Sequence, residues 1–230
     1  MNKLDIIYED GDILVCHKPA GVATQTKRLG QQDMESLLKN YRAKKGEPPQ
    51  IWVVHRLDQP VEGVMVFAKN QKTAADLSKQ VQQHIIGKYY YAVSAHVPKE
   101  KAGVLEDYLL TDKKANVTQV ITDINAGSEK VDIPKDAKKA KLEYEVVNTK
   151  EDKTFIRVKL HTGRQHQIRV QLAHMGCPLI GDSKYGDGAS KEGLALCSYR
   201  LEFLHPTMKK EMRFEVEPKG KIFEEFFKMK

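Results

Sequence analysis

The feature that most constrains this chain is a charged turn enclosed by two apolar runs. Residues 55–63 read HRLDQPVEG, after the run IWVV at residues 51–54 and before the run VMVFA at residues 64–68. Both runs have the composition of buried β-strands. Desolvation disfavours an ionised side chain, so charges this close to buried strands require partners or water. The turn is therefore either a solvated loop or the mouth of a cleft in which its charges do chemistry.

Length and composition fit a globular protein outside the membrane. The chain has 230 residues, of which 40% are hydrophobic and 30% charged, which permits one large domain or two small ones. No apolar run is long enough for a membrane span and the N-terminus lacks the apolar core of a signal peptide, so we expect a cytoplasmic protein with no membrane partner. The net charge of +7 favours a polyanionic partner.

No metal or cofactor motif is present. Three widely separated cysteines, Cys16, Cys177 and Cys197, argue against a disulfide framework and fit a reducing compartment. His174 and Cys177 come closest to a zinc pair, but no second pair matches them, and packing is the favoured interpretation. The glycine-rich stretch GDGASKEG lacks the Gly-Lys-Ser/Thr ending of a phosphate loop. We expect neither metal nor cofactor.

Hydrophobic patterning predicts an α+β fold, because strands outnumber helices and do not alternate strictly with them. Strands are expected at residues 13–17, 51–58, 63–69, 88–95, 141–147, 154–160, 194–203 and 212–218. We expect a single domain over residues 1–230. Residues 111–141, rich in turn residues and lysines, are predicted to be an exposed loop or hairpin excursion.

Three helices are expected. Asn70 is the predicted N-cap of a helix with Ala74, Leu77, Val81 and Ile85 on its apolar side, ended by Gly87. A second helix of about ten residues follows the turn at Gly163, with Ile168, Leu172 and Met175 buried, Gly176 as its C-cap and Pro178 beyond. A short helix is predicted within residues 221–230.

Four separated stretches resemble one family. HRLDQPVEGVMVFAK at residues 55–69 resembles the catalytic motif of pseudouridine synthases, His-Arg-Leu-Asp-x-x-Thr-Ser-Gly, and KYYYA at residues 88–92 resembles their Lys-x-Tyr-x-Ala strand. LHTGRQHQIRVQLAHMGCPLIGDSKYG at residues 160–186 is similar to the third motif, and HKPAGVATQ at residues 17–25 to the entry strand and turn. The branch indicated is the RluA-like one, which modifies ribosomal and transfer RNA.

The resemblance implies both fold and reaction. The fold would be the pseudouridine synthase catalytic fold, a mixed, mainly antiparallel sheet flanked by helices and loops with a central cleft. The reaction would break the N1–C1′ bond of a uridine, turn the uracil and join C5 to C1′. The sequence departs from the motif at Val61 and Glu62, which stand where the family has Thr-Ser, and Glu62 could repel Asp58 or alter RNA contacts. The entry motif begins by residue 13, so we expect no preceding S4 domain, and we expect a monomer.

The resemblance also assigns roles to residues. Asp58 is the candidate carboxylate, acting as nucleophile at C1′ or as base at the 2′ position, two routes that the sequence leaves open. Arg169 would be its ion-pair partner, since a guanidinium favours the ionised form of a neighbouring carboxylate, and Tyr90 would stack on the target base. Arg56 would fill the gap left by the extruded nucleotide. Further RNA contacts are expected from Arg164, His166, Lys138 and Lys139.

Two other functions compete with this interpretation. A non-catalytic RNA-binding protein could keep the fold; Val61 and Glu62 favour it, whereas the presence of Asp58, Tyr90 and Arg169 opposes it. A glycosidase could use Asp58 and Glu62 as paired carboxylates, but it would need an aromatic sugar groove, and the single Trp52 lies in an apolar strand.

Overall fold

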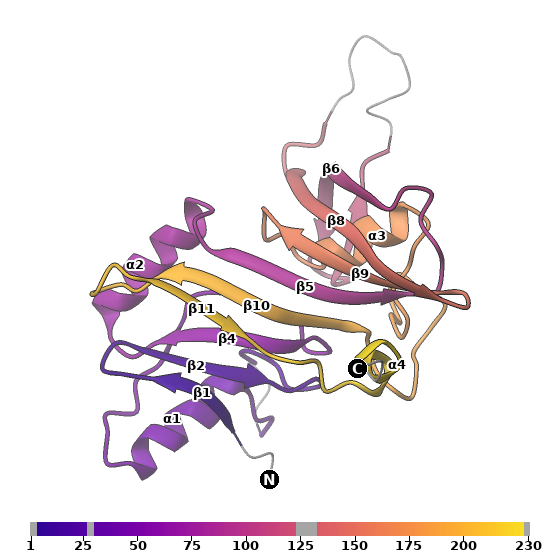
Figure 1. Ribbon diagram of the computed structural model, residues 1–230. Helices are drawn as coiled ribbons and strands as arrows, with labels where there is room; N and C mark the ends of the chain where they lie inside the picture. The colour runs from indigo at the N-terminus through magenta and orange to yellow at the C-terminus, as the bar shows by residue number, and fades with distance from the viewer. Residues whose placement is uncertain (1–3, 27–29, 123–132, 228–230) are drawn as a thin grey trace. The chain divides into compact units, whose positions relative to one another are not determined.

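The computed structural model describes residues 4–26, 30–122 and 133–227 (Figure 1). The chain divides into two compact units. Unit 1 comprises Met1–Tyr89 and Cys197–Lys219, and unit 2 comprises Tyr90–Leu196 and Gly220–Lys230. No helix in the described ranges has the length and apolar character that a membrane span requires.

Unit 1 contains the charged turn. Its sheet runs in the order β1-β2-β4-β10, while β3 pairs with β4 and β11 pairs with β10. Its elements are β1 (Asp5–Glu9), β2 (Ile13–Lys18), α1 (Met34–Lys44), β3 (Trp52–Val53), β4 (Glu62–Ala68), α2 (Gln71–Gln82), the start of β5 (Gly87–Ser94), β10 (Leu196–Leu204) and β11 (Glu211–Glu215). Among the pairings whose register is described, only β4 with β10 is parallel.

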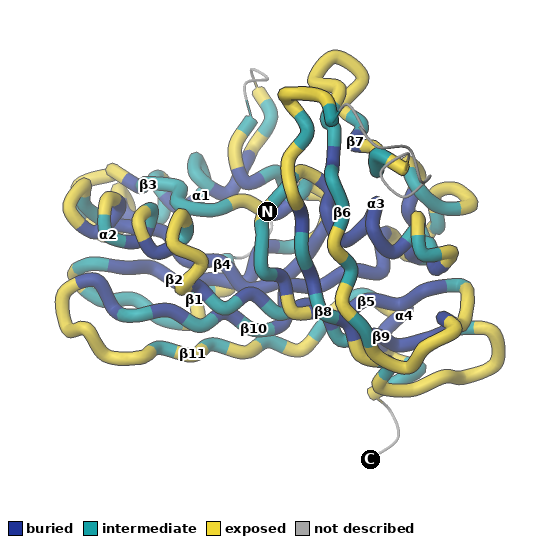
Figure 2. The backbone as a smooth tube through the Cα atoms, turned by 90° about the horizontal axis from the view of Figure 1, so that it is seen from above, coloured by how far each residue is buried: buried dark blue, intermediate teal, exposed yellow. Residues whose placement is uncertain are grey.

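The core of unit 1 is built around β4. All seven residues of this strand are buried, and Figure 2 shows the strand in dark blue. A strand buried on both faces reads as a continuous apolar run, which is why residues 64–68 do not alternate with polar residues. One face packs with α2 through Ala74 and Leu77. The outer strand β11 instead alternates between exposed and partly buried residues (Figure 2).

The sheet of unit 2 runs in the order β5-β9-β8-β6-β7. Its elements are the rest of β5, β6 (Ala102–Asp112), β7 (Val117–Val120), β8 (Lys138–Lys150), β9 (Lys153–Leu160), α3 (Gln167–His174) and α4 (Lys221–Phe227). Helix α3 packs against β6 and β7. Helix α4 contributes phenylalanine rings to a cluster around Phe155.

The predicted α+β class and the mainly antiparallel sheet are confirmed, while the central cleft stays a prediction. Within the predicted excursion at residues 111–141, β7 and the beginning of β8 form strands, and residues 123–132 lie outside the described residues. The terminal helix is present as α4.

Several predicted boundaries were wrong. Helix α2 begins at the predicted Asn70 cap but ends at Gln82; His84 then takes a left-handed backbone, and Gly87 opens β5. The strand predicted over residues 51–58 is only Trp52–Val53, so the charged turn begins earlier than expected. Strand β1 and helix α1 were not predicted. The signal for α1 is present, because Asp33 and Ser36 form a capping box before it.

The helix of the third motif also differs from its prediction. It has eight residues, its C-cap is Met175, and Gly176 follows with a positive φ. Every residue of Gln167–Leu172 is buried, whereas an amphipathic helix was expected. Met175, predicted to be buried, is only partly so.

Candidate active site

The charged turn ends at Gly63, which lies between two strands of unit 1. Gly63 lies opposite Lys18 of β2 on one side and Ser198 of β10 on the other. Its φ is +131°, and a Cβ atom there would lie 2.3 Å from the carbonyl oxygen of Ser198. Only glycine fits such a backbone at such a distance. The turn itself is closed by the amide of Val61, which donates to the carbonyl of Asp58 at 3.0 Å.

The residue before Asp58 is fixed by a buried threonine. The hydroxyl of Thr24 donates to the carbonyl of Leu57 at 3.0 Å and accepts from its amide at 3.2 Å. Leu57 is buried, whereas Asp58 is only partly buried. The backbone that carries the carboxylate is therefore held rigidly, while the carboxylate stays within reach of solvent.

Lys18 also stabilises this turn, through a hydrogen bond to its backbone. Its side chain is fully buried, and its ammonium donates to the carbonyls of Pro19, Val22 and Gln59, at 3.1, 2.5 and 3.1 Å. Burial lowers the pKa of Lys18 to about 8, while the negative charges of Asp58 and Glu62 oppose this shift. Lys18 thus places a positive charge within electrostatic range of Asp58 inside unit 1. Sequence reasoning missed it, although it stands in the family-like HKPAG stretch.

Glu62 points into the interior of unit 1. It is 5% exposed, its two carboxylate oxygens accept from the amide of Lys219 at 3.2 and 3.0 Å, and Nε2 of His17 lies 3.5 Å from Oε2. The carboxylate that departs from the family motif is thus compensated by its own neighbours in the fold.

The other two charged residues of the turn have different environments. His55 accepts a hydrogen bond from the amide of Val66 at 3.1 Å, and burial together with the charge of Lys88 lowers its pKa to about 3. Its imidazole is therefore neutral and supports the backbone of β4. Arg56 is exposed, which suits a side chain expected to contact RNA.

In unit 2, Arg169 is bound by Asp182. Nε donates to Oδ2 and Nη2 donates to Oδ1, both at 2.7 Å, and both side chains are buried. Burial acts to raise the pKa of Asp182, but hydrogen bonds from Arg169 and from the amides of Lys184 and Tyr185 outweigh it and hold the pKa below its ordinary value. Sequence reasoning missed Asp182, whose only signal is the Gly-Asp-x-x-Tyr-Gly tail of the third motif.

His166 and Arg169 both contact Tyr185. His166 is the N-cap of α3 with a φ of 53°, and its Nδ1 lies 2.7 Å from the hydroxyl of Tyr185. That hydroxyl also accepts from the amide of Thr118 at 2.8 Å. The guanidinium of Arg169 lies 5.2 Å from the centre of the Tyr185 ring, within the range of a cation–π contact. Tyr185 therefore links β7, His166 and Arg169.

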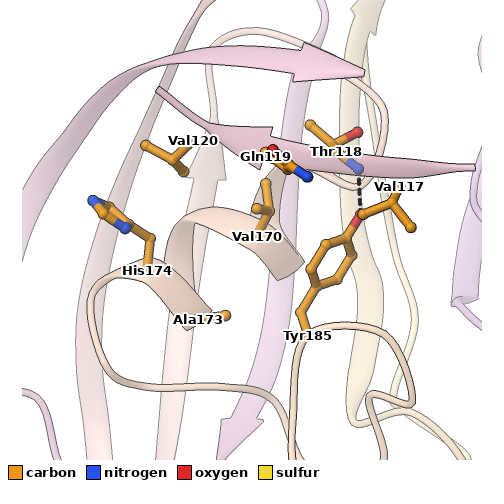
Figure 3. Close-up of a pocket in the computed structure, with 8 residues that line it drawn as sticks. All are labelled: Val117, Thr118, Gln119, Val120, Val170, Ala173, His174 and Tyr185. Atoms are coloured by element: carbon orange, nitrogen blue, oxygen red, sulfur yellow. Dashed lines mark hydrogen bonds between the residues drawn. The ribbon is translucent and has the colours of Figure 1, made fainter. Parts of the chain in front are cut away.

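A shallow groove of about 290 Å³ borders this network (Figure 3). It lies between β7 and α3, with the Tyr185 ring at one end and His174 toward the other. Its lining residues are Val117, Thr118, Gln119, Val120, Val170, Ala173, His174 and Tyr185. Half of these residues are small and apolar, and none of Asp58, Tyr90 and Arg169 lines the groove.

The remaining candidates also belong to unit 2. Tyr90 is buried on β5, between the less buried Tyr89 and Tyr91. Arg164 donates to the carbonyl of Lys139 at 3.0 Å. Lys138 and Lys139 are exposed, and the ammonium of Lys139 lies 3.1 Å from Glu106.

The structure thus brings Lys18, Glu62 and Asp58 together in unit 1, and Arg164, His166, Arg169 and Asp182 around α3 in unit 2. Asp58 and Arg169 belong to different units, so their ion pair stays a prediction. Among the described residues, no group of three or more His, Cys, Asp or Glu side chains is arranged to hold a metal ion.

Known proteins resemble this chain over most of its length. The family model described as RNA pseudouridylate synthase matches residues 12–174. The chain is 34% identical over 218 residues to the uncharacterized RNA pseudouridine synthase MG209 homolog of Mycoplasma pneumoniae. It is 32% identical over 208 residues to the uncharacterized RNA pseudouridine synthase YhcT of Bacillus subtilis. These matches cover 93% and 89% of this chain. They cover 66% and 65% of the relatives, so the chain spans slightly less than two thirds of their length.

A further relative and two solved structures agree. The dual-specificity RNA pseudouridine synthase RluA of Vibrio parahaemolyticus is 35% identical over 213 residues, which are 88% of this chain and 78% of RluA. Human RNA pseudouridylate synthase domain containing 4 shares the fold with a TM-score of 0.77 and 24% identity, over 94% of this chain and 89% of the human one. Human RNA pseudouridylate synthase domain containing 1 shares the fold with a TM-score of 0.72 and 21% identity, over 94% of this chain and 84% of the human one. The chain belongs to the RNA pseudouridylate synthase family, in its RluA-like branch.

Proposed function

We propose that this protein isomerises a specific uridine to pseudouridine in structured ribosomal or transfer RNA, with Asp58 as the catalytic carboxylate. The reaction breaks the N1–C1′ bond, forms the C5–C1′ bond, releases the C5 proton and returns a proton to N1, so no atoms are gained or lost. The proposal includes that the chain acts as a monomer without metal or cofactor.

The observation that carries the proposal is the setting of Asp58. It lies in the region that the family model matches, and the hydrogen bonds between Thr24 and Leu57 fix the backbone next to it. The positive charge of the buried Lys18 ammonium interacts with its carboxylate. A nucleophile or base must be held rigidly and must be ionised, and this turn supplies a rigid backbone and a neighbouring positive charge. Both the nucleophilic route and the route through the 2′ position use the same carboxylate.

Tyr90 and Arg169 complete the proposed catalytic group. Tyr90 would stack on the uracil and Arg169 would pair with Asp58. Support for Arg169 comes from Asp182, which fixes its guanidinium through Nε and Nη2. A side chain fixed in this way loses little further entropy when it meets a second partner.

Arg56, Arg164, His166, Lys138 and Lys139 would contact RNA. A target base inside structured RNA must be unstacked before it reacts, at a cost of a few kcal/mol, and Arg56 would fill the space it leaves. One relative of this chain is a dual-specificity RNA pseudouridine synthase, which supports an RNA substrate of this class.

The test is the Asp58→Asn protein. We expect it to bind RNA about as tightly as wild type but to release no tritium from RNA labelled at C5, because the amide can neither attack C1′ nor accept a proton. Mapping pseudouridines in total RNA with and without the gene identifies the substrate to use.

Two outcomes would contradict the proposal. An active Asp58→Asn protein would remove Asp58 from the mechanism. A wild-type protein that binds the mapped RNA but releases no tritium would favour the alternative, a non-catalytic RNA-binding protein that keeps the fold.

A further inference from the structure

We propose that Glu62 is a positioning residue for the catalytic turn: its buried carboxylate anchors the segment at residues 216–219 and stabilises the ammonium of Lys18 beneath Asp58. This inference rests on the proposed function of Asp58. It gives a role to the residue at which the chain departs from the family motif.

Glu62 occupies a place from which it can act on the turn. It is the first residue of β4, four residues after Asp58, and it pairs with Cys197 of the parallel strand β10. The next residue, Gly63, lies opposite Lys18 in the β2–β4 register. A shift at Glu62 is therefore transmitted directly to the backbone of the turn and to the lysine below it.

The contacts of Glu62 are those of an anchor rather than of an acid catalyst. Both of its carboxylate oxygens accept from the amide of Lys219, and Nε2 of His17 lies 3.5 Å from one of them. The side chain of Lys219 in turn binds Asp5 of β1 at 2.6 Å, and the amide of Val216 donates to the carbonyl of Tyr199 at 2.8 Å. The segment that follows β11 is thus held against β1, β4 and β10.

The charge of Glu62 bears on Lys18 as well. The ammonium of Lys18 is fully buried and bonds three backbone carbonyls, two of them in residues 19–22 and one at Gln59 in the turn. Three charged or titratable groups act on it electrostatically: Asp58, Glu62 and Cys16. A buried ammonium persists only where nearby negative charge compensates its desolvation. Asp58 loses its negative charge when it attacks C1′ or accepts a proton, so Glu62 is the carboxylate that can compensate Lys18 throughout the reaction.

Two substitutions separate the charge of Glu62 from its reach. Glu62→Gln removes the charge but keeps the length, and Glu62→Asp keeps the charge but is one methylene shorter. Glu217→Gln, an exposed carboxylate in the same segment, is the matched control. For each protein, kcat and KM on the mapped RNA are measured from pH 6 to 10, together with hydrogen exchange at the Lys219 amide without RNA.

We expect wild-type kcat to fall at alkaline pH as Lys18, whose pKa is about 8, loses its proton. In Glu62→Gln this alkaline fall should move to lower pH by about one unit, because Lys18 loses a compensating charge. In Glu62→Asp the alkaline fall stays in place, but the Lys219 amide exchanges faster and kcat drops about ten- to hundredfold, the size of effect that a small misplacement of a catalytic group causes. KM is expected to stay within about twofold in both, since Glu62 is buried and is not expected to contact RNA. Glu217→Gln should match wild type.

A wild-type pH profile in Glu62→Gln would overturn the inference, and so would an unchanged Lys219 exchange rate in Glu62→Asp. If Glu62→Gln lowers kcat equally at every pH and the alkaline fall does not move, Glu62 stabilises the fold without acting on Lys18, which also contradicts the inference. If wild type itself makes no pseudouridine, the proposed function fails instead, and the exchange measurement alone then decides whether Glu62 anchors the segment.

Discussion

At the scale of single residues, the pair of Arg169 and Asp182 fixes one buried side chain of α3. Two buried hydrogen bonds of 2.7 Å join the groups, and Asp182 also accepts from the amides of Lys184 and Tyr185. Replacing Asp182 removes the two hydrogen bonds and the negative charge that it supplies to the buried guanidinium of Arg169. Asp182→Asn is therefore expected to lower the free energy of unfolding by about 3–5 kcal/mol, measured by urea denaturation at pH 7.

Asp187→Asn is the control for that experiment. Asp187 lies in the same loop, but 82% of its side chain is exposed. An exposed ion pair contributes about 0–1 kcal/mol, so the control should unfold close to wild type. Equal stabilities for both variants and wild type would show that the Arg169–Asp182 pair does not stabilise the fold.

His55 predicts a pH dependence of stability. Its pKa is about 3 in the folded chain, because of burial and the charge of Lys88, and about 6.5 when unfolded. Between these values the unfolded state binds more protons, so the contribution of His55 is present above pH 6.5 and is lost as the pH falls toward 3. The stability of wild type relative to His55→Gln should fall by about 2 kcal/mol between pH 7 and pH 5.

Urea titrations at the two pH values check this expectation, with His96→Gln at an exposed position as the control. A stability difference between wild type and His55→Gln that does not change with pH would mean that the imidazole is not neutral in the fold.

The proposed catalytic residues could be identified in the sequence only through their motifs. Asp58 and Arg169 were named because they stand in recognisable stretches, not because any local pattern demanded a charge. The residues that hold them in place, Lys18 and Asp182, were missed. Lys18 is 41 residues from Gln59, which it bonds in the charged turn, and Asp182 is 13 residues from Arg169. Hydrogen bonds over such separations depend on the fold and leave no periodic signal.

At the scale of elements, the strongest local signals were the reliable ones. The β4 run and the Asn70 cap of α2 were predicted correctly, because buried strands and capped helices have distinct local patterns. The end of α2 was wrong since His84, rather than glycine, takes the left-handed backbone. Burial of α3 on all sides could not be predicted either, because Gln167, Arg169 and Gln171 are buried polar residues that find partners only in the folded unit.

At the scale of the whole molecule, the order of the chain does not follow the two compact units. Residues 197–219 complete unit 1, more than a hundred residues after its first part ends at Tyr89. Strands β10 and β11 contribute to the sheet beside β4, so the parallel pairing of Glu62 and Gly63 with Cys197 and Ser198 joins distant parts of the sequence. A local reading of the sequence finds the strands but not this division.

The charge of the whole molecule leads to the last prediction, that RNA binding is driven by the release of counterions. With a net charge of +7, log K should fall linearly with log salt, with a slope of about −0.7 to −0.9 for each phosphate neutralised. If exposed Lys138 and Lys139 each meet one phosphate, the double Gln variant should reduce the slope by about 1.4–1.8 and leave the chemical step unchanged.

A second double variant tells local contacts from net charge. Lys44 and Lys72 are exposed on α1 and α2 of unit 1, and changing both to Gln removes the same two charges. If Lys138 and Lys139 bind phosphates, their variant alone loses slope, because counterion release counts the phosphates that are contacted and not the total charge. Equal losses in both variants would assign the effect to the net charge, and a flat salt response in wild type would contradict electrostatic binding altogether.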